Sequence, residues 1–276
     1  MSKTLARIVA AGGRMVTRWH TPYRRAMALA EASRLMRPLW QVETQAGPLV
    51  FEASSGRALI DPAHLYTAEP ETIRWIDGLA PDERLWDIGA NVGTYALYAA
   101  KRGLDVMAFE PSAATYANMM RNIELSRLGG RIKALCLAFD SHNHLERLRM
   151  ASTEAGHSMH AFGQNETVLR VLKDPHEQWV LGYGIDAFIA QFQVPPPDHI
   201  KLDVDSIEEK ILAGATQTLK GVRSVMVEID GGVRDAGGAG IRRLLAEAGL
   251  EEDRDMVSAE RRNVLFRRPE GALAAV

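Results

Sequence analysis

An apolar run that ends in a glycine-spaced turn constrains the fold of this chain more than any other feature. Residues 85–93 read Leu-Trp-Asp-Ile-Gly-Ala-Asn-Val-Gly, and the next apolar run, 106–109, ends at Glu110. Gly89 and Gly93 lack a Cβ, so the backbone can approach a ligand closely, and the following helix would offer its N-terminus. An acid that closes the second strand can accept hydrogen bonds from ribose hydroxyls. The pattern predicts an α/β domain that binds a nucleotide-like ligand at this turn.

The spacing of that turn distinguishes two classes of cofactor. The fingerprint for NAD, G-x-G-x-x-G, uses its middle glycine for the pyrophosphate and its third for helix packing. This chain has Gly89-x-Asn91-x-Gly93 instead, and Asp87 at the mouth of the turn would repel a pyrophosphate. The same carboxylate suits a cationic ligand such as S-adenosylmethionine, which carries an ammonium and a sulfonium. The turn favours S-adenosylmethionine as the cofactor, and an NAD(P)-dependent oxidoreductase on a similar fold is the alternative.

Apolar runs and helical patterns alternate along most of the chain after residue 65. The expected strands cover residues 84–88, 104–110, 131–138, 199–204 and 222–229, and the runs 254–257 and 263–267 would close the sheet as a hairpin. The expected helices cover residues 93–102, 112–125, 186–192, 206–219 and 240–248. Such alternation predicts an α/β fold with a mostly parallel seven-stranded sheet and an antiparallel last strand.

Two further stretches do not follow this alternation of strands and helices. Upstream of it, the patterns predict a helix over 24–37, a small β-meander over 40–60 and a helix that opens at Glu69-Pro70. Residues 140–182 are the least regular part, with short strands expected at 145–150, 168–172 and 179–181.

The charge of the chain is unevenly distributed. Residues 1–40 hold eight Lys or Arg residues against the single acid Glu31, which is +7; since the whole chain carries −2, the rest carries −9. The apolar side chains within the basic segment, such as Leu5 and Ile8, would let it lie on an anionic membrane surface. A peripheral helical extension with a solvated basic face is the alternative. The −9 balance of the remainder disfavours a nucleic-acid partner.

The number of cysteines indicates the redox state of the compartment in which the protein is expected. Cys136 is the only cysteine among 276 residues, so an intrachain disulfide is excluded. A lone thiol within the strand-like run 132–139 is expected to be buried rather than nucleophilic, and a reducing cytoplasm is the expected location.

A second motif follows the fourth strand of the expected sheet, where Lys201-Leu202-Asp203-Val204-Asp205-Ser206-Ile207-Glu208 would face the same crevice as Asp87 and Glu110. With the turn at 87–93 and Phe109-Glu110-Pro111, it resembles the FkbM-type family of S-adenosylmethionine-dependent methyltransferases. Asp205 stands where that family has Glu, and Ser206 where it has Gly, which weakens inference about the substrate.

The resemblance implies a Rossmann-like class I methyltransferase domain over residues 65–268. Residues 1–64 would form a basic extension with a helix and the small β-meander, and residues 269–276 a tail. It also implies O-methylation of a hydroxyl on a sugar, glycan or other small metabolite. A non-catalytic methyltransferase-like scaffold, docking a partner through the basic N-terminus, is a further alternative.

The candidate site residues fall into two groups. Asp203 is expected to act as the base or to orient the acceptor, with Lys201 holding its carboxylate and Glu208 beside them; capping of the next helix is the alternative for Asp203 and Glu208. Seven residues are expected to bind the cofactor: Glu69, Asp87, Gly89, Asn91, Gly93, Glu110 and Asp140. Within that group, Glu69 is expected at the ammonium and Asp140 at the adenine amino group.

No metal ligand is assigned. Asp203, Glu228 and Asp230 could together hold Mg²⁺, but carboxylates at strand ends need no metal when bases and solvent are near. The histidines at 142, 144, 157 and 160 lack a cysteine partner and are expected in a solvated loop, with His157 or His160 as a possible second base.

Overall fold

The chain is described by a computed structural model that covers residues 2–158, 160–163, 166–167, 170–171, 174–205, 207–229, 238–256, 262–269 and 271. It divides into two compact units, Met1–Leu39 and Trp40–Val276. The second unit therefore includes residues 40–64, which the sequence assigned to the N-terminal extension.

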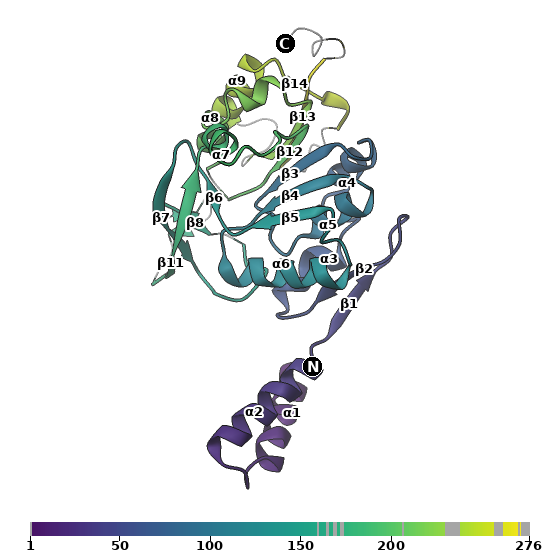
Figure 1. Cartoon of the computed structure of the whole chain (residues 1–276), viewed down its shortest axis with the longest axis vertical. Coiled ribbons are helices and arrows are strands. Elements are labelled where there is room, and N and C mark those ends of the chain that lie inside the picture. Colours follow the sequence, from purple (N-terminus) through teal and green to yellow (C-terminus); the bar gives the residue numbers. More distant parts are fainter. Residues whose placement is uncertain are drawn as a thin grey trace. The chain divides into compact units, whose positions relative to one another are not determined.

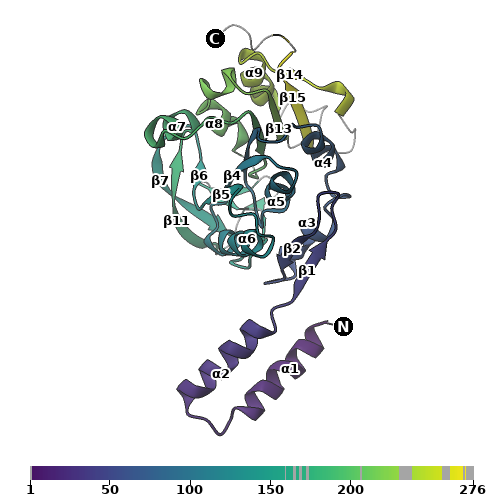
Figure 2. The same cartoon turned by 45° about the vertical axis from the view of Figure 1, so that its right-hand side comes forward.

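The first unit is a pair of helices, α1 (Ser2–Val16) and α2 (Pro22–Leu35), which Figure 2 shows side by side. The hydroxyl of Thr21 accepts a hydrogen bond from the N–H of Arg24 and caps α2, the helix predicted at 24–37. A Cβ on Gly13 would lie 3.1 Å from Cδ2 of Leu29, so glycine lets the two helices approach. Within the described residues, no helix is long and apolar enough to cross a membrane.

The second unit is built on a seven-stranded sheet with the order β14-β15-β13-β12-β3-β4-β5 (Figure 1; β15 is labelled in Figure 2). Its strands are β3 (Arg84–Ile88), β4 (Asp105–Phe109), β5 (Ile132–Leu135), β12 (His199–Leu202), β13 (Ser224–Glu228), β14 (Glu251–Glu252) and β15 (Asn263–Arg267). Strands β3, β4, β5, β12 and β13 are parallel, whereas β15 runs antiparallel to both of its neighbours. This arrangement confirms the predicted mostly parallel sheet with an antiparallel last strand.

Side chains of the central strands alternate between two cores, as expected for a parallel sheet buried on both faces. Trp86 and Ile88 belong to one core together with Phe188 of α7, while Leu85 belongs to the other together with Leu97 of α5. The helices of the first core are α7 (Ile185–Phe192), α8 (Glu208–Ala213) and α9 (Ala239–Glu247). The helices of the second core are α4 (Pro70–Asp77), α5 (Thr94–Lys101) and α6 (Ala113–Leu125). The residues at the carboxyl ends of the strands therefore open on a rim between two helical layers.

A second sheet is inserted between β5 and α7. It has the order β6-β11-β7-β8, with β6 (Ala138–Phe139), β7 (His144–Met150), β8 (Ala161–Phe162) and β11 (His176–Tyr183). The strand predicted at 131–138 is therefore wrong in its second half, because Ala138 leaves the central sheet and pairs in parallel with Gly182. Buried Leu148, Val180 and Phe162 join this sheet to the first core. The short strands β9 (Glu166–Thr167) and β10 (Arg170–Val171) pair with each other.

Three other predicted elements differ from the structure. Residues 40–60 form β1 (Leu39–Val42) and β2 (Leu49–Glu52) and then turn into η1 (Arg57–Leu59) and α3 (Ile60–Ala63), so they are not a meander. The helix predicted at 206–219 is shorter, with α8 followed by η2 (Thr218–Lys220). Residues 254–256 form a 3-10 turn, η4 (Arg254–Met256), and β14 is the strand that pairs with β15.

Candidate active site

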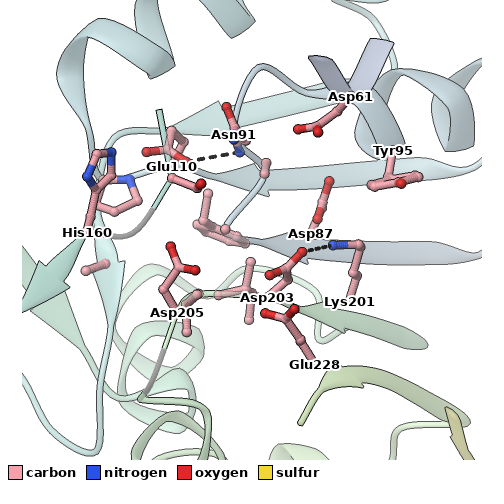
Figure 3. A pocket seen from close by; sticks show the side chains of 18 of the residues that line it. Asp61, Asp87, Asn91, Tyr95, Glu110, His160, Lys201, Asp203, Asp205 and Glu228 are labelled. Carbon is pink, nitrogen blue, oxygen red and sulfur yellow. Dashed lines mark hydrogen bonds and ion pairs between the residues drawn. The ribbon is translucent and has the colours of Figure 1, made fainter. Parts of the chain in front are cut away.

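A cavity of about 320 Å³ opens at the carboxyl ends of β3, β4 and β12. Seven of the ten predicted site residues line it: Glu69, Asp87, Gly89, Asn91, Glu110, Lys201 and Asp203. Figure 3 shows Glu110 and Asn91 toward one end, and Asp87, Lys201 and Asp203 toward the other. The cavity thus brings together the two motifs on which the sequence argument rests.

The glycine turn after β3 is shaped by contacts with its neighbours. Gly89 has φ +84°, and a Cβ there would lie 1.8 Å from the carbonyl oxygen of Asp203. Gly93 has φ +86°, and a Cβ there would lie 2.7 Å from Cδ1 of Leu97 and 2.9 Å from Cγ of Met119. Gly89 thus lets β12 end directly against the turn, whereas Gly93 serves the packing of α5 and does not line the cavity.

Asp87 is a buried carboxylate without a hydrogen-bond partner. The residue is 1% exposed, and neither oxygen meets the geometry of a hydrogen bond within the described part of the chain. Burial raises the pKa of Asp87 to about 6, although the nearby N–H of Ala96 slightly lowers the pKa of the carboxyl group. The Oδ1 of Asn91 and the Oγ1 of Thr94 also line the cavity, buried and without partners among the described residues. Together they fit a cationic, hydrogen-donating ligand such as an ammonium group.

Glu110 is held in place by the backbone of the turn. Its carboxylate accepts hydrogen bonds from the N–H groups of Asn91 at 3.0 Å and Ser112 at 2.8 Å. Burial raises the pKa of Glu110 to about 7. Each oxygen keeps a lone pair for a ligand hydroxyl, which is the arrangement expected of a ribose-binding acid.

Lys201 is a buried ammonium among carboxylates. Its Nζ lies 2.8 Å from Asp203 and 4.0 Å from Glu69, and it stands over the ring of Tyr95 at 4.9 Å from the centroid. Cross-strand pairing places Lys201 next to Asp87. Burial alone would lower the pKa of Lys201, but the surrounding carboxylates raise it well above its ordinary value. Lys201 is therefore a fixed positive charge that allows several acids to share one cavity.

The two acids bound to Lys201 differ in their ionisation. Burial would raise the pKa of Asp203, but Lys201 and a hydrogen bond with Glu228 hold it below its usual range. Burial raises the pKa of Glu69 to about 6, although its carboxylate accepts a 2.8 Å hydrogen bond from Thr72. Asp203 is thus the stronger acid of the two, and it stays ionised at a pH where Glu69 takes up a proton.

The other predicted site residues lie outside the cavity. Asp140 accepts a 2.6 Å hydrogen bond from the N–H of Ser141 and lies 3.5 Å from Nε2 of His144. Glu208 stands in the first turn of α8 and accepts a 3.2 Å hydrogen bond from the N–H of Val204, so it supports the loop that carries Asp203. Asp230, considered as a metal ligand with Asp203 and Glu228, lies outside the described residues. Among those described, no group of three or more acids, histidines or cysteines could hold a metal ion.

The sequence did not single out several residues that line the cavity. Asp61 comes from the short helix α3, and burial raises its pKa; Tyr95 comes from the first turn of α5. His160, considered only as a possible second base, lines the cavity beside Glu110 and away from Lys201 (Figure 3). Each reaches the cavity through tertiary packing, and none stands in a sequence motif that could have identified it.

Comparison with known proteins identifies the domain. A sequence model described as the methyltransferase FkbM domain matches residues 87–251. Hexuronic acid methyltransferase AglP of Haloferax volcanii is 26% identical over 189 residues, which cover 66% of this chain and 72% of AglP. Methyltransferase 1 of Beauveria bassiana is 23% identical over 145 residues, which cover 48% of this chain and 58% of that protein.

Two of the solved structures that are similar to this chain are methyltransferases. Methyltransferase FkbM of Methylobacillus flagellatus superposes with a TM-score of 0.43 and 15% identity, covering 67% of this chain and 43% of that one. Magnesium protoporphyrin IX methyltransferase of Synechocystis, solved with bound S-adenosylmethionine, superposes with a TM-score of 0.45 and 14% identity, covering 78% of this chain and 85% of that one. The chain thus spans less than two thirds of the first of these and of Methyltransferase 1.

The match at 87–251 covers more than half of the chain and contains both motifs of the cavity. It also decides between the two cofactor classes that the glycine turn left open. The chain belongs to the FkbM family of methyltransferases and uses S-adenosylmethionine as its methyl donor.

Proposed function

We propose that this protein transfers a methyl group from S-adenosylmethionine to a hydroxyl oxygen of a sugar or glycan, and that sugars of the hexuronic acid class are the first acceptors to test. The relative from Haloferax volcanii, a hexuronic acid methyltransferase, supports the sugar class. The observation that carries the proposal is the buried Lys201–Asp203 pair beside the unpartnered carboxylate of Asp87. One carboxylate is free to hold a cationic cofactor, and the other is kept ionised to meet a hydroxyl.

The cofactor end of the cavity follows from the polar atoms that lack partners. Asp87, Asn91 and Thr94 would accept hydrogen bonds from the ammonium of the cofactor, and Glu110 would accept them from its ribose hydroxyls. Glu69 would stand near the same ammonium, and its own pKa of about 6 means that a nearby cation would favour its ionised form. S-adenosylmethionine supplies a methyl group on a positively charged sulfur, which is already an activated leaving group.

The acceptor end needs a group that can take a proton. Asp203, held ionised by Lys201, would accept a hydrogen bond from the acceptor hydroxyl and orient its oxygen for in-line attack. As the oxygen–carbon bond forms and the carbon–sulfur bond breaks, with its electron pair going to sulfur, the hydroxyl proton would pass to Asp203. Glu208 would act only by positioning, because it holds the backbone of Val204 rather than the cavity.

The test is transfer of a labelled methyl group to free sugars and oligosaccharides that contain hexuronic acid, with matched neutral hexoses as the comparison. Transfer that Asp203→Ala abolishes, while binding of S-adenosylhomocysteine is kept, supports the proposal. Products that mild alkali cleaves would be esters, which would move the reaction from a hydroxyl to the carboxylate. An unchanged turnover number in Asp203→Ala would remove Asp203 from the reaction, and binding of the cofactor without transfer to any sugar would support the scaffold alternative.

We further propose that the N-terminal helix pair rests on an anionic lipid surface on the cytoplasmic side. Leu5, Ile8 and Val9 share one face of α1 and are 63%, 63% and 48% exposed. Arg7 and Arg14 lie on the opposite side of the helix, and the +7 charge of residues 1–40 complements anionic headgroups. We keep nucleic acid outside the proposal because the remainder carries −9.

Vesicle sedimentation tests this surface. Binding to vesicles with phosphatidylserine, lost in vesicles of phosphatidylcholine alone and weakened by salt, is expected. Leu5→Asn should weaken binding, whereas Ala10→Asn, on the other side of the same helix, should not. Equal binding by both variants would contradict the proposal.

A further inference from the structure

The adenine end of the cavity raises a question that the family motifs leave open, and its answer rests on the proposed function. Beyond Glu110 the lining becomes apolar, with Pro111, Leu137, Leu148 and Phe162. Leu148 and Phe162 are cross-strand partners in the inserted sheet. A slot of this kind suits the faces of a flat purine, but an apolar wall gives its exocyclic amine no acceptor.

The acid expected to meet that amine is already engaged. Asp140 was predicted there because it follows the third strand, but that strand breaks at 135 and β6 turns into the inserted sheet. Its carboxylate bonds the N–H of Ser141, pairs with His144, and does not line the cavity. Another side chain must therefore supply the acceptor if the amine is to be paired.

His160 is a described lining side chain that meets this need; Asp205 also lies toward this end of the cavity, but it already has an interaction within the chain. It directly precedes β8, lines the cavity, and lies beside Glu110 in Figure 3. Both ring nitrogens are buried and lack a hydrogen-bond partner within the described residues; the backbone of His157 approaches the ring without completing a hydrogen bond. A buried ring with two unpaired nitrogens is costly, so a ligand that pairs one of them would be favoured.

The ionisation of His160 fits an acceptor. Burial, followed by the neighbouring His157, lowers the pKa of His160 to about 4, so the ring is neutral at physiological pH. A neutral imidazole carries one N–H and one unprotonated nitrogen. The approach of the His157 backbone favours the tautomer whose N–H points toward it, which leaves the other nitrogen as the acceptor.

The chain just before His160 is anchored by contacts with two other segments. The hydroxyl of Ser55 donates a 2.7 Å hydrogen bond to the carbonyl of Ala155, and the N–H of Gly156 donates a 3.3 Å hydrogen bond to Thr115. Gly156 has φ +78°, and a Cβ there would lie 2.6 Å from the backbone of Ala58. These contacts fix residues 155 and 156 against residues 55–58 and against α6, a few residues before His160.

We propose that His160 accepts a hydrogen bond from the exocyclic amine of the cofactor's adenine and thereby selects adenine over purines without that amine. The inserted sheet, rather than the end of the third central strand, supplies the base-reading residue. His160 is thus a specificity-determining, cofactor-binding residue and not a second base at the acceptor.

Calorimetric binding of two ligands tests the proposal without relying on turnover. S-adenosylhomocysteine carries the amine, whereas S-inosylhomocysteine has a carbonyl oxygen in its place and a proton on the neighbouring ring nitrogen N1. The wild-type chain should bind the first about 10- to 100-fold more tightly, since the second would leave His160 unpaired or repelled. His160→Phe should reduce this ratio to within about threefold, and His160→Gln, which keeps an acceptor oxygen, should restore part of it.

Asp140→Asn is the matched control and should leave the ratio at its wild-type value. An unchanged ratio in His160→Phe, a wild-type chain that binds both ligands equally, or loss of the ratio in Asp140→Asn would each overturn the assignment. The ratio is measured only on chain that binds, so partial unfolding of a variant does not distort it, and His160→Gln serves if the Phe variant fails to fold. Absence of binding by the wild type to both ligands would contradict the proposed function, which is a different result from binding without discrimination.

Discussion

Replacing the Asp87 carboxylate is expected to stabilise the ligand-free fold and to weaken cofactor binding. Its pKa is about 6 in the folded chain against an ordinary 3.8, because burial disfavours the charged form. A raised carboxyl pKa means that its contribution to stability is fully present below pH 3.8 and is lost as the pH rises through about 6. At pH 8 without ligand, the ionised Asp87 therefore destabilises the fold, and Asp87→Asn should relieve this.

The magnitude follows from the size of the shift. A rise from 3.8 to about 6 is about two units, and about 1.4 kcal/mol per unit gives about 3 kcal/mol at pH 8. At pH 5 only part of the shift has been titrated, so the gain falls to about half of that value. In a unit of this size, about 3 kcal/mol corresponds to an increase in Tm of roughly 6–12 °C.

Urea unfolding of ligand-free protein at pH 8 and pH 5 measures the effect. Asp87→Asn should raise the free energy of unfolding at pH 8, and the gain should shrink at pH 5. Asp198→Asn is the control with the opposite sign. Although burial raises the pKa of Asp198, its hydrogen bonds and ion pair with Arg84 hold it below the usual range, so this variant should be less stable at pH 8.

The same Asp87→Asn variant should bind S-adenosylhomocysteine about 10- to 100-fold more weakly, since a charged hydrogen bond to the ammonium is lost. A variant that is less stable than wild type at pH 8, or whose gain does not depend on pH, would refute the reasoning. Either result would mean that the Asp87 carboxylate is paired with groups of the chain itself and does not need a cationic ligand.

Three other substitutions or conditions give separate tests. Binding of S-adenosylhomocysteine at pH 6 should release protons, because the ammonium of the ligand favours the ionised form of Asp87, and this release should vanish by pH 8. Calorimetry in two buffers of different ionisation enthalpy measures the number of protons released, and proton uptake would contradict the prediction. Lys201→Met should abolish methyl transfer and lower the free energy of unfolding by about 3 kcal/mol or more, since Glu69 and Asp203 lose their shared cation. Lys210→Met, at an exposed position of α8, should change neither methyl transfer nor the free energy of unfolding. Equal effects of the Lys201 and Lys210 variants would contradict the role given to Lys201. Gly89→Ala should lower stability by more than about 4 kcal/mol because its Cβ would overlap the carbonyl of Asp203, whereas Gly129→Ala, which has open space around it, should be close to neutral in thermal unfolding.

The features that the sequence predicted well are those set by local rules. The strand at 84–88 was predicted with the bounds that β3 shows, because its side chains alternate between two buried faces and a glycine turn ends it. Glu110, Lys201 and Asp203 were placed at one rim because parallel strands end on the same side of a sheet.

The features that the sequence missed depend on contacts between distant segments. Asp140 was placed by counting from the end of a strand, but that strand splits, and its second half joins β11 about 40 residues later. Asp61 lies in a four-residue helix with no periodic signal, and it reaches the cavity only because residues 55–63 fold back over the inserted loop. Nothing in the sequence indicates why residue 156 is glycine, because the backbone of Ala58, which leaves no room for a Cβ there, lies about 100 residues earlier in the chain.

The contact between Gly89 and Asp203 has a consequence for engineering this family. The Cβ position of Gly89 lies 1.8 Å from the carbonyl oxygen of Asp203 and 3.1 Å from Cγ1 of Val204, so the donor turn and the acceptor segment meet backbone to backbone at the edge of one cavity. A chimera that imports a new acceptor segment around 201–208 would thus press a foreign carbonyl directly on the donor turn. Substrate range is therefore best altered by exchanging both segments as one cassette, and a graft of either alone should cost cofactor affinity even when its own residues are well chosen.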